Sequence, residues 1–290
     1  VSGLNQQSVQ LADLDGDGLE EAVAFLKTTG EKPLKAYIFS MVDGDYQPMD
    51  VIEGDGTSFA SVEYAALTGG PGVEILITRQ LSTDVLQSLC AYTYSGGHVV
   101  ELMSTGCTAY RTADLDEDGR TDLFVLRSDA ERQQGVAELY RWRDGQMERE
   151  PEASLSAAAS DVRRILIGDL TADVPAVFVA SGYEDGSLVT DVFAFRGGTF
   201  RNLTAAGSGG GISTVRNYYV YAADIDEDGR TDLPDIHTLP SAADSEESFS
   251  VIDWYNLSLN AVRTHKCTTY HNFSGGWYLT LPDAWQDQFC

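Results

Sequence analysis

The sequence predicts an all-β protein, specifically a β-propeller of four-stranded blades. An acidic loop motif recurs along the 290 residues, and aromatic strands with glycine turns recur in the same phase. The sequence has no sustained 3.6-residue hydrophobic periodicity, so long helices are not expected. Four strands in each repeat of ~50 residues are typical of propeller blades, because one small sheet cannot bury both faces and must stack on its neighbours. A β-sandwich with unrelated DG turns is the alternative.

The acidic motif is intact in three stretches and eroded in two. The intact copies are ADLDGDGLEEAVAFL at Ala12–Leu26, ADLDEDGRTDLFVL at Ala113–Leu126 and ADIDEDGRTDLPDI at Ala223–Ile236. The eroded copies are AALTGGPGVEILIT at Ala65–Thr78 and GDLTADVPAVFVA at Gly168–Ala180. The five copies start at residues 13, 66, 114, 169 and 224. This near-regular spacing indicates five structural repeats.

A predicted hairpin follows each acidic loop at a nearly constant distance. In the first four repeats its turn glycines are Gly44, Gly97, Gly145 and Gly198, each within a DG or GG pair. Such pairs between apolar residues favour two-residue hairpin turns. In the fifth repeat, VIDWYNLSL places the turn near Asn256.

Each repeat is therefore expected to contain four strands. The first strand, for example Val9–Ala12, leads into the acidic loop, the second, Ala22–Leu26, follows it, and the third and fourth form the hairpin. Pro234 interrupts the second strand of the fifth repeat, so we expect that strand to be short or at a sheet edge.

The chain is predicted to be a single propeller domain over residues 1–290. Its repeats run over about 9–61, 62–109, 110–164, 165–219 and 220–272. Residues 273–290 are expected to form a closing strand or to begin another blade. The stretches 204–214 and 239–248 read as loops rather than domain boundaries.

The charge excludes several classes of partner. Nineteen Lys and Arg against 45 Asp and Glu give a net charge of −26, which disfavours nucleic acids and anionic membrane surfaces. No apolar run approaches the ~20 residues of a transmembrane helix. We therefore expect no nucleic-acid partner and no membrane span. We also expect a monomer. Because the sequence begins at Val1, we expect an export or anchor segment to precede it.

The four cysteines give little guidance. Cys90, Cys107, Cys267 and Cys290 form no CxxC motif and no zinc-type cluster. Cys90 and Cys107 flank one predicted hairpin, but a turn at Gly96-Gly97 places them out of register. Their pairing and the redox compartment stay open.

The intact loops carry oxygen ligands in a pattern that suits Ca²⁺. Carboxylates occupy positions 1, 3, 5 and 9, and the carbonyl at position 7 adds another oxygen, giving the six or seven donors that Ca²⁺ prefers. The predicted ligands are Asp13, Asp15, Asp17, Leu19, Glu21; Asp114, Asp116, Asp118, Arg120, Asp122; and Asp224, Asp226, Asp228, Arg230, Asp232. We expect about three structural ions, because empty loops would suffer carboxylate repulsion. The alternative is a solvated acidic turn.

The motif begins like an EF-hand loop but ends differently. The Glu that an EF-hand needs at position 12 is replaced by Ala24, Val125 and Asp235, and the flanking segments read as strands. The acid at position 9 instead resembles the FG-GAP/VCBS-type repeat of integrin α-subunit propellers and many bacterial surface proteins. The resemblance implies Ca²⁺ between the first and second strands of a blade, in a secreted, lipoprotein-type or otherwise surface-attached protein.

The eroded repeats depart from this pattern, so we expect no metal there. Ala66, Thr68 and Gly70 replace the first three ligands of the second repeat, leaving Glu74. The fourth loop is one residue short and has Thr171 at its middle position.

No motif for catalysis is found: GxSxG, HExxH, Walker and Rossmann patterns are absent from the sequence. Aromatic residues gather in the last quarter, either as core or as a stacking platform for sugar rings. The candidate ligand contacts are Tyr219, Tyr221, Trp254, Tyr270 and Trp277. The sequence favours a non-enzymatic adhesion module that binds a protein or a glycan. A lyase-like enzyme acting on polysaccharides and a structural spacer in a longer surface protein are the alternatives.

Overall fold

The computed structural model describes residues 7–81, 87–129, 134–172, 174–205, 214–239 and 249–285. The chain divides into two compact units, each of which we describe separately. The N-terminal unit comprises Val1–Ser128 and Ala137–Pro151, and the C-terminal unit comprises Asp129–Val136 and Glu152–Cys290. No helix within the described ranges is long and apolar enough to cross a membrane.

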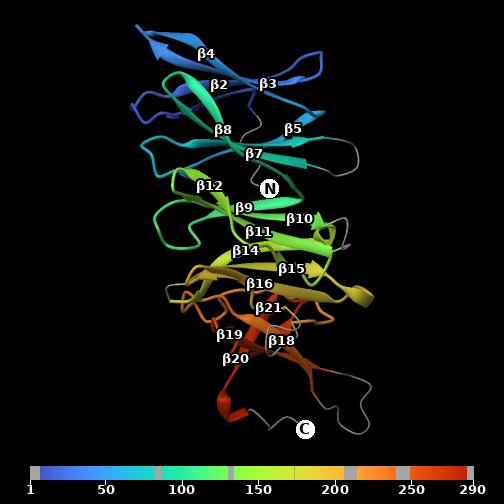
Figure 1. The fold of residues 1–290 in the computed structure, drawn as a ribbon. Coiled ribbons are helices and arrows are strands. Elements are labelled where there is room, and N and C mark those ends of the chain that lie inside the picture. The colour runs from blue at the N-terminus through green and yellow to red at the C-terminus, as the bar shows by residue number, and fades with distance from the viewer. Residues whose placement is uncertain are drawn as a thin grey trace. The chain divides into compact units, whose positions relative to one another are not determined.

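The described residues are all-β and form five antiparallel sheets (Figure 1), as the sequence predicted. The first sheet contains β1 (Val9–Ala12), β2 (Glu21–Lys27), β3 (Leu34–Val42) and β4 (Asp45–Gly54). The second contains β5 (Ser58–Ala65), β6 (Glu74–Gln80), β7 (Gln87–Ser95) and β8 (His98–Cys107). The third contains β9 (Ala109–Ala113), β10 (Asp122–Asp129), β11 (Gln134–Arg143) and β12 (Gln146–Arg149), and the two-residue β13 (Ala153–Ser154) pairs with β11.

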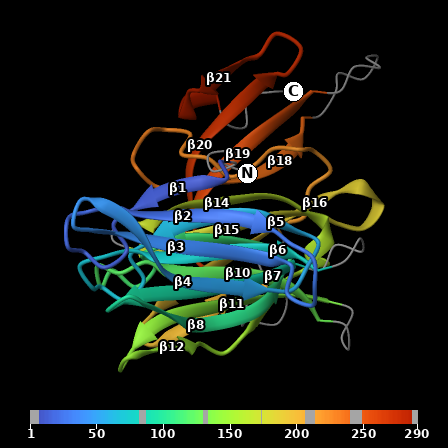
Figure 2. The ribbon, with the colours of Figure 1, turned by 90° about the horizontal axis from the view of Figure 1, so that it is seen from above.

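The last two sheets belong to the C-terminal unit. The fourth contains β14 (Val162–Thr171), β15 (Val174–Gly182), β16 (Leu188–Arg196) and β17 (Thr199–Asn202). The fifth contains β18 (Leu233–Thr238), β19 (Ser250–Leu257), β20 (Arg263–Asn272) and β21 (Trp277–Leu281). In every sheet the first four strands lie side by side in chain order, which Figure 2 shows for β1 to β4. The helical segments of the described residues are three 3₁₀ turns: Ala159–Asp161, Glu184–Gly186 and Asp283–Trp285.

The four predicted hairpin turns form at the expected glycines. Both central residues of each turn have positive φ, as a type I′ turn requires. The pairs are Asp43-Gly44, Gly96-Gly97, Asp144-Gly145 and Gly197-Gly198. The same turn therefore fixes the register of the outer hairpin in the first four repeats.

Alternate residues of the second strands pack on opposite neighbouring sheets. In β6, Ile75 and Ile77 share a core with Val23 and Ile38 of the first sheet. Leu76, which points to the other face, packs in a core that includes Val125 of the third sheet. Because side chains alternate along a strand, a continuous apolar run can bury both faces of a sheet. The three sheets of the N-terminal unit are therefore stacked.

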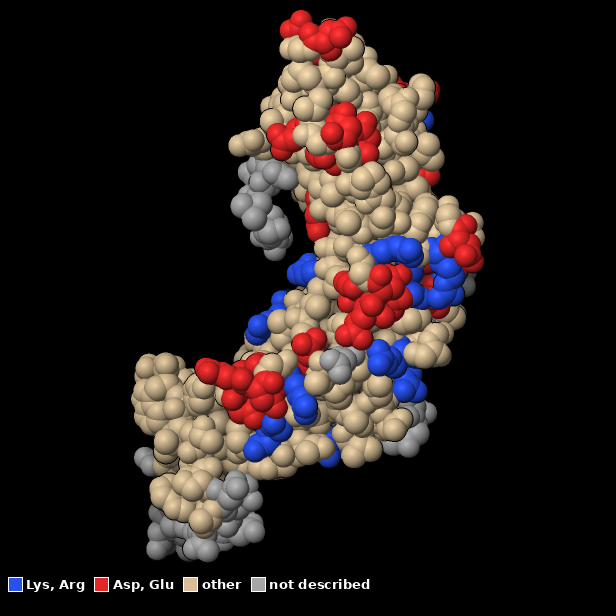
Figure 3. Space-filling model, turned by 90° about the vertical axis from the view of Figure 1, so that its left-hand side faces the viewer, with Lys and Arg blue, Asp and Glu red and all other residues tan. Residues whose placement is uncertain are grey.

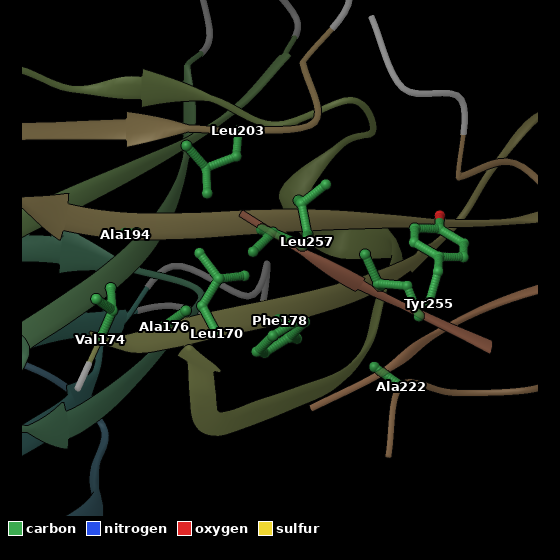
Figure 4. Packing of buried hydrophobic residues seen from close by; sticks show 11 residues of the cluster. Leu170, Val174, Ala176, Phe178, Ala194, Leu203, Ala222, Tyr255 and Leu257 are labelled. Atoms are coloured by element: carbon green, nitrogen blue, oxygen red, sulfur yellow. The ribbon is translucent and has the colours of Figure 1, made fainter. Parts of the chain in front are cut away.

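The C-terminal unit repeats this packing between its own two sheets. Figure 4 shows Leu170 and Phe178 of the fourth sheet beside Leu257 and Tyr255 of the fifth, and all four are buried. Leu233, which corresponds to Ile75 in the repeat, lies in the same core. The repeats thus use the same strand positions for stacking.

The fifth repeat departs from the others in its strands. As Pro234 predicted, β18 is a short strand at the edge of its sheet. The expected strand before the loop is reduced to an isolated bridge between Ala223 and Asp232. The prediction of a turn near Asn256 was wrong: Asn256 lies inside β19, and the chain turns over 258–262. Within 273–290, β21 pairs with β20 as the fourth strand of the fifth sheet.

Three cysteines are free. Cys90 pairs across the hairpin with Ser104, and Cys107 pairs with Gln87, so the two cysteines are out of register as expected. Cys267 is also free. Cys290, most of the predicted loop 204–214 and nearly all of 239–248 lie outside the described residues.

Candidate metal centres and ligand cleft

Three groups of carboxylates converge in the three intact loops, each between the first and second strand positions of its repeat. In each group the oxygen atoms lie within 4.8 Å of one another. The groups are Asp13, Asp15, Asp17; Asp114, Asp116, Asp122; and Asp224, Asp226, Asp232. Figure 3 shows acidic side chains gathered in separate patches on one face, with basic side chains beside some of them. The three groups can hold a metal ion.

The loop backbone explains this convergence. In the first loop, the N–H groups of Gly16 and Gly18 donate to the two carboxylate oxygens of Asp13 at 2.8 and 3.1 Å. Both glycines have positive φ, and Glu117 and Gly119 adopt the same φ sign in the second intact loop. The positive φ at the sixth position, Gly18 and Gly119, bends the chain around the first carboxylate.

The position-7 residues, whose carbonyls were predicted ligands, are held by the preceding acid. The N–H of Leu19 donates to Oδ1 of Asp17 at 2.7 Å, and the N–H groups of Arg120 and Arg230 donate at 2.9 Å to Asp118 and Asp228. The Arg120 side chain also contacts Asp118 at 3.3 Å. Among the predicted carboxylate ligands, Glu21, Asp118 and Asp228 do not belong to the converging groups.

The position-9 carboxylates are buried beneath the loops. Glu21, Asp122 and Asp232 each accept a hydrogen bond from the N–H at position 2, at 2.9 to 3.1 Å. Burial is the largest influence on the pKa values of all three carboxyl groups. It raises the pKa of Glu21, and it raises the pKa of Asp122 to about 7 and that of Asp232 to about 6. The nearby loop carboxylates raise these pKa values further. A bound cation would favour the ionised form.

The third strand supplies a partner to each of these position-9 acids. Ser40 of β3 lies beside Glu21, with its hydroxyl 2.7 Å from the Tyr94 hydroxyl, and Asn256 of β19 donates to Asp232 at 2.5 Å. In the third sheet the corresponding residue is Arg141 of β11, whose Nε lies 3.8 Å from Oδ1 of Asp122. These partners come from distant sequence positions, and the sequence analysis did not identify them.

In the eroded second loop, the one remaining acid accepts hydrogen bonds from donors of the same loop. Glu74 accepts hydrogen bonds from the N–H of Leu67 at 2.7 Å and from the Thr68 hydroxyl at 2.7 Å. The hydroxyl of Thr93 on β7 lies 3.4 Å from the same carboxylate. Neutral donors therefore surround Glu74 where the intact loops have further carboxylates. In the fourth repeat, Asp169 lies within β14.

Oxygen donors alone make up the converging groups, which suits a hard divalent cation better than a soft metal. The first loop has the least internal compensation. Within the described residues, no Lys or Arg nitrogen lies within 4 Å of the carboxylates of Asp13, Asp15 or Asp17, whereas basic side chains reach the other two groups. The donor set of the first loop therefore fits a cation on its own chemistry.

The five aromatic residues predicted as ligand contacts differ in their exposure and in their neighbours. Trp254 is only 2% exposed, and its Nε1 donates to Thr269 at 2.7 Å, so its ring offers no face to a ligand. Tyr221 is half-buried beneath the Arg164 guanidinium, which lies 5.4 Å from its ring centre. Tyr270 and Trp277 form a tilted pair on β20 and β21, with ring centres 6.1 Å apart.

Tyr219 lines an open cleft of about 410 Å³ in the C-terminal unit. Tyr183 provides a second aromatic ring, and Arg163, Asp161 and Glu184 provide charged groups. Tyr219 is 58% exposed, so its ring is accessible. Rings with nearby hydrogen-bonding groups suit a polar ligand that has apolar faces. The sequence alone did not place Tyr183 beside Tyr219.

The sequence matches no family model and no curated protein. Among solved structures, the chain is similar to the Bacillus licheniformis rhamnogalacturonan lyase PL11, with 13% identity and a TM-score of 0.44 over 88% of this chain and 61% of that chain. It is also similar to the rhamnogalacturonan lyase YesW, with 11% identity and a TM-score of 0.43 over 88% of this chain and 66% of that chain. The chain thus spans less than two thirds of the length of either lyase structure.

Proposed function

We propose that this chain is a calcium-stabilised β-propeller that acts outside the cell as a binding module for a protein or a carbohydrate. The observation that carries the proposal is the convergence of three carboxylates in each of three equivalent loops. With the carbonyls of Leu19, Arg120 and Arg230, these loops would offer oxygen-rich sites of the kind that Ca²⁺ occupies. The ion would neutralise the carboxylates and brace each loop.

The loop position supports an FG-GAP/VCBS-type identity for the repeats. In the first sheet the acidic loop joins β1 to β2, and in the third it joins β9 to β10. The remaining two strands of each sheet form the hairpin with the type I′ turn. A secreted or surface location follows from the same proposal, because the Ca²⁺ concentration outside cells is high enough to fill even sites with millimolar dissociation constants.

An exposed apolar face on the first sheet supports the closed ring of a propeller. Val9 and Leu11 of β1 pair with Ala24 and Ala22 of β2, which correspond to Ile77 and Ile75 of the second repeat. In the second repeat this face is buried against the preceding sheet, whereas Leu11 in the first is 52% exposed. A propeller supplies the missing neighbour, because ring closure gives every blade two.

Small-angle scattering tests the ring. A compact chain of this length has a radius of gyration of about 19 Å. A value near this, independent of protein concentration, is the expected result. A clearly larger radius for the monomer would rule out ring closure.

The cleft beside Tyr219 supports a carbohydrate as the bound partner. Tyr183 and Tyr219 can stack on the apolar faces of sugar rings, and Arg163, Asp161 and Glu184 can hydrogen-bond hydroxyls. Tyr219 was proposed as a ligand contact from the sequence, and the cleft adds Tyr183 to it. Together they favour a saccharide over an apolar ligand.

Thermal unfolding in the presence of Ca²⁺, Mg²⁺ or excess chelator tests the calcium proposal. An ion that binds only the folded state raises its stability by about 2.7 kcal/mol for each site at one hundred times the dissociation constant. We expect a large rise with Ca²⁺ and a smaller one with Mg²⁺, because Mg²⁺ demands tighter octahedral geometry. Asp13→Asn should reduce the rise. An identical melting temperature in all three solutions would refute calcium stabilisation.

A further inference from the structure

The three acidic groups differ in the residue that faces them from the third strand. At this position the first loop has Ser40, the eroded second has Thr93, the fifth repeat has Asn256, and the third repeat has Arg141. Only Arg141 among these four carries a charge. The three loops therefore have nearly the same acidic sequence but different electrostatic surroundings.

Arg141 lies against the acidic group of the third repeat. Its Nη2 contacts Oδ2 of Asp116 directly, its Nε lies 3.8 Å from Oδ1 of Asp122, and its Nη1 lies 3.0 Å from Oε1 of Glu150. The residue is only 7% exposed. Two of its carboxylate partners, Asp116 and Asp122, are two of the three acids that converge in this loop.

A buried guanidinium cannot be neutralised to make room for another cation, because arginine stays protonated in proteins. A divalent ion between Asp114, Asp116 and Asp122 would have to share two carboxylates with Arg141. The two positive charges would repel each other where solvent screens them little. Displacing the guanidinium would break its contacts with Asp116 and Asp122 and leave a buried positive charge less well compensated, which is unfavourable.

The other two groups lack such a fixed cation. Ser40 beside the first loop is neutral. In the fifth repeat Lys266 contacts Asp226 at 3.0 Å and Asp228 at 2.5 Å, but its side chain is 20% exposed and sits on a flexible stem. A partly exposed ammonium can turn into solvent when a divalent ion arrives, whereas the Arg141 side chain is only 8% exposed.

We propose that Arg141 acts as a built-in counter-ion, so that the acidic loop of the third repeat binds Ca²⁺ much more weakly than the loops of the first and fifth repeats. The inference rests on the proposed calcium binding and specifies which loops take part. The chain then has two strong calcium sites and one that is largely self-neutralised.

Calorimetric Ca²⁺ titration of the whole chain tests the stoichiometry. We expect two strong sites and a third that is weaker by at least about tenfold, the ratio that corresponds to 1.4 kcal/mol. Asp13→Asn should remove one strong site, whereas Asp114→Asn should leave both. Three sites of equal affinity would overturn the inference while preserving the proposed function. No binding at all would overturn both.

Exchanging the facing residues gives a reciprocal test. Arg141→Ser introduces the residue of the first repeat and should convert the weak site into a third strong one. Ser40→Arg should abolish the strong site of the first loop. Arg143→Ser, on the same strand but half exposed, is the matched control and should leave the stoichiometry unchanged. If Arg141→Ser does not fold, Ser40→Arg still decides: unchanged binding in that variant would overturn the inference.

Discussion

The backbone N–H of Thr231 donates to the carbonyl oxygen of Asp169 at 2.8 Å, which links the acidic loop of the fifth repeat to the corresponding loop of the fourth. The bond joins position 8 of one loop to position 1 of the loop before it, and it recurs in the N-terminal unit. The other pairs are Val73 with Asp13 at 3.2 Å and Thr121 with Ala66 at 2.9 Å. The acidic loops therefore lie where stacked sheets meet, and bracing a loop would stabilise the stack.

Gly168 and Thr231 should show strong coupling in a double-mutant cycle. A Cβ atom at Gly168 would lie 2.2 Å from Oγ1 of Thr231. We expect Gly168→Ala to destabilise the fold by about 1–3 kcal/mol through overpacking. Thr231→Ala removes the clashing oxygen, so the added methyl should cost much less in that background. Denaturant unfolding of the four proteins measures the coupling, and strictly additive effects would contradict the close approach.

A charged residue in place of Leu11 should destabilise the fold if another sheet packs on the outer face of the first sheet. Leu11→Asp would then bury an unpaired carboxylate and cost several kcal/mol, about 3 or more. Val100 of β8 is similarly exposed, at 57%, and Val100→Asp is the control with a small expected effect. Chemical denaturation compares the two variants. Equal, small losses would argue that the face is solvated.

The metal-free protein should lose stability as pH rises from about 4 to about 7. Burial raises the pKa of Asp122 to about 7 and of Asp232 to about 6, whereas the unfolded values are near 3.9. In this window the folded state binds more protons than the unfolded state, so its stability falls with increasing pH. Melts in chelator should show a loss of about 2–4 kcal/mol between pH 5 and pH 8.

Saturating Ca²⁺ should flatten or reverse this dependence, because the ion requires ionised ligands. The double variant Asp122→Asn/Asp232→Asn is the control and should have a shallower pH slope without metal. A chelated wild-type protein that is most stable at pH 8 would contradict the assignment of these buried acids.

Tyr219 and Tyr218 provide a matched pair for testing carbohydrate binding. Both are exposed, at 58% and 46%, but only Tyr219 lines the cleft with Tyr183. Loss of a stacking ring costs about 1 kcal/mol or more, so Tyr219→Ala should weaken binding at least about fivefold, while Tyr218→Ala should not. A panel of oligosaccharides measured by saturation-transfer NMR gives the comparison. Recovery of shortened oligosaccharides would favour the lyase alternative over a binding module.

Much of the candidate site could be predicted from the sequence because its geometry is local. Positive φ at Gly18 and Gly119 and the carboxylates two residues apart determine how each loop turns. The same holds for the type I′ turns at Gly44 and Gly198. The turn of the fifth hairpin was misplaced because no DG or GG pair marks it, and the chain turns instead with Ala261 at positive φ.

The sequence by itself determined the five repeats, the all-β class and the three acidic loops, since strand periodicity and turn chemistry act over a few residues. Only the tertiary structure decided the surroundings of those loops. Lys266 reaches Asp226 across 40 residues of chain, Arg141 reaches Asp116 across 25, and Trp254 is enclosed by contacts to distant strands. Charge compensation and burial depend on which distant residues share a space, and local sequence patterns do not encode that.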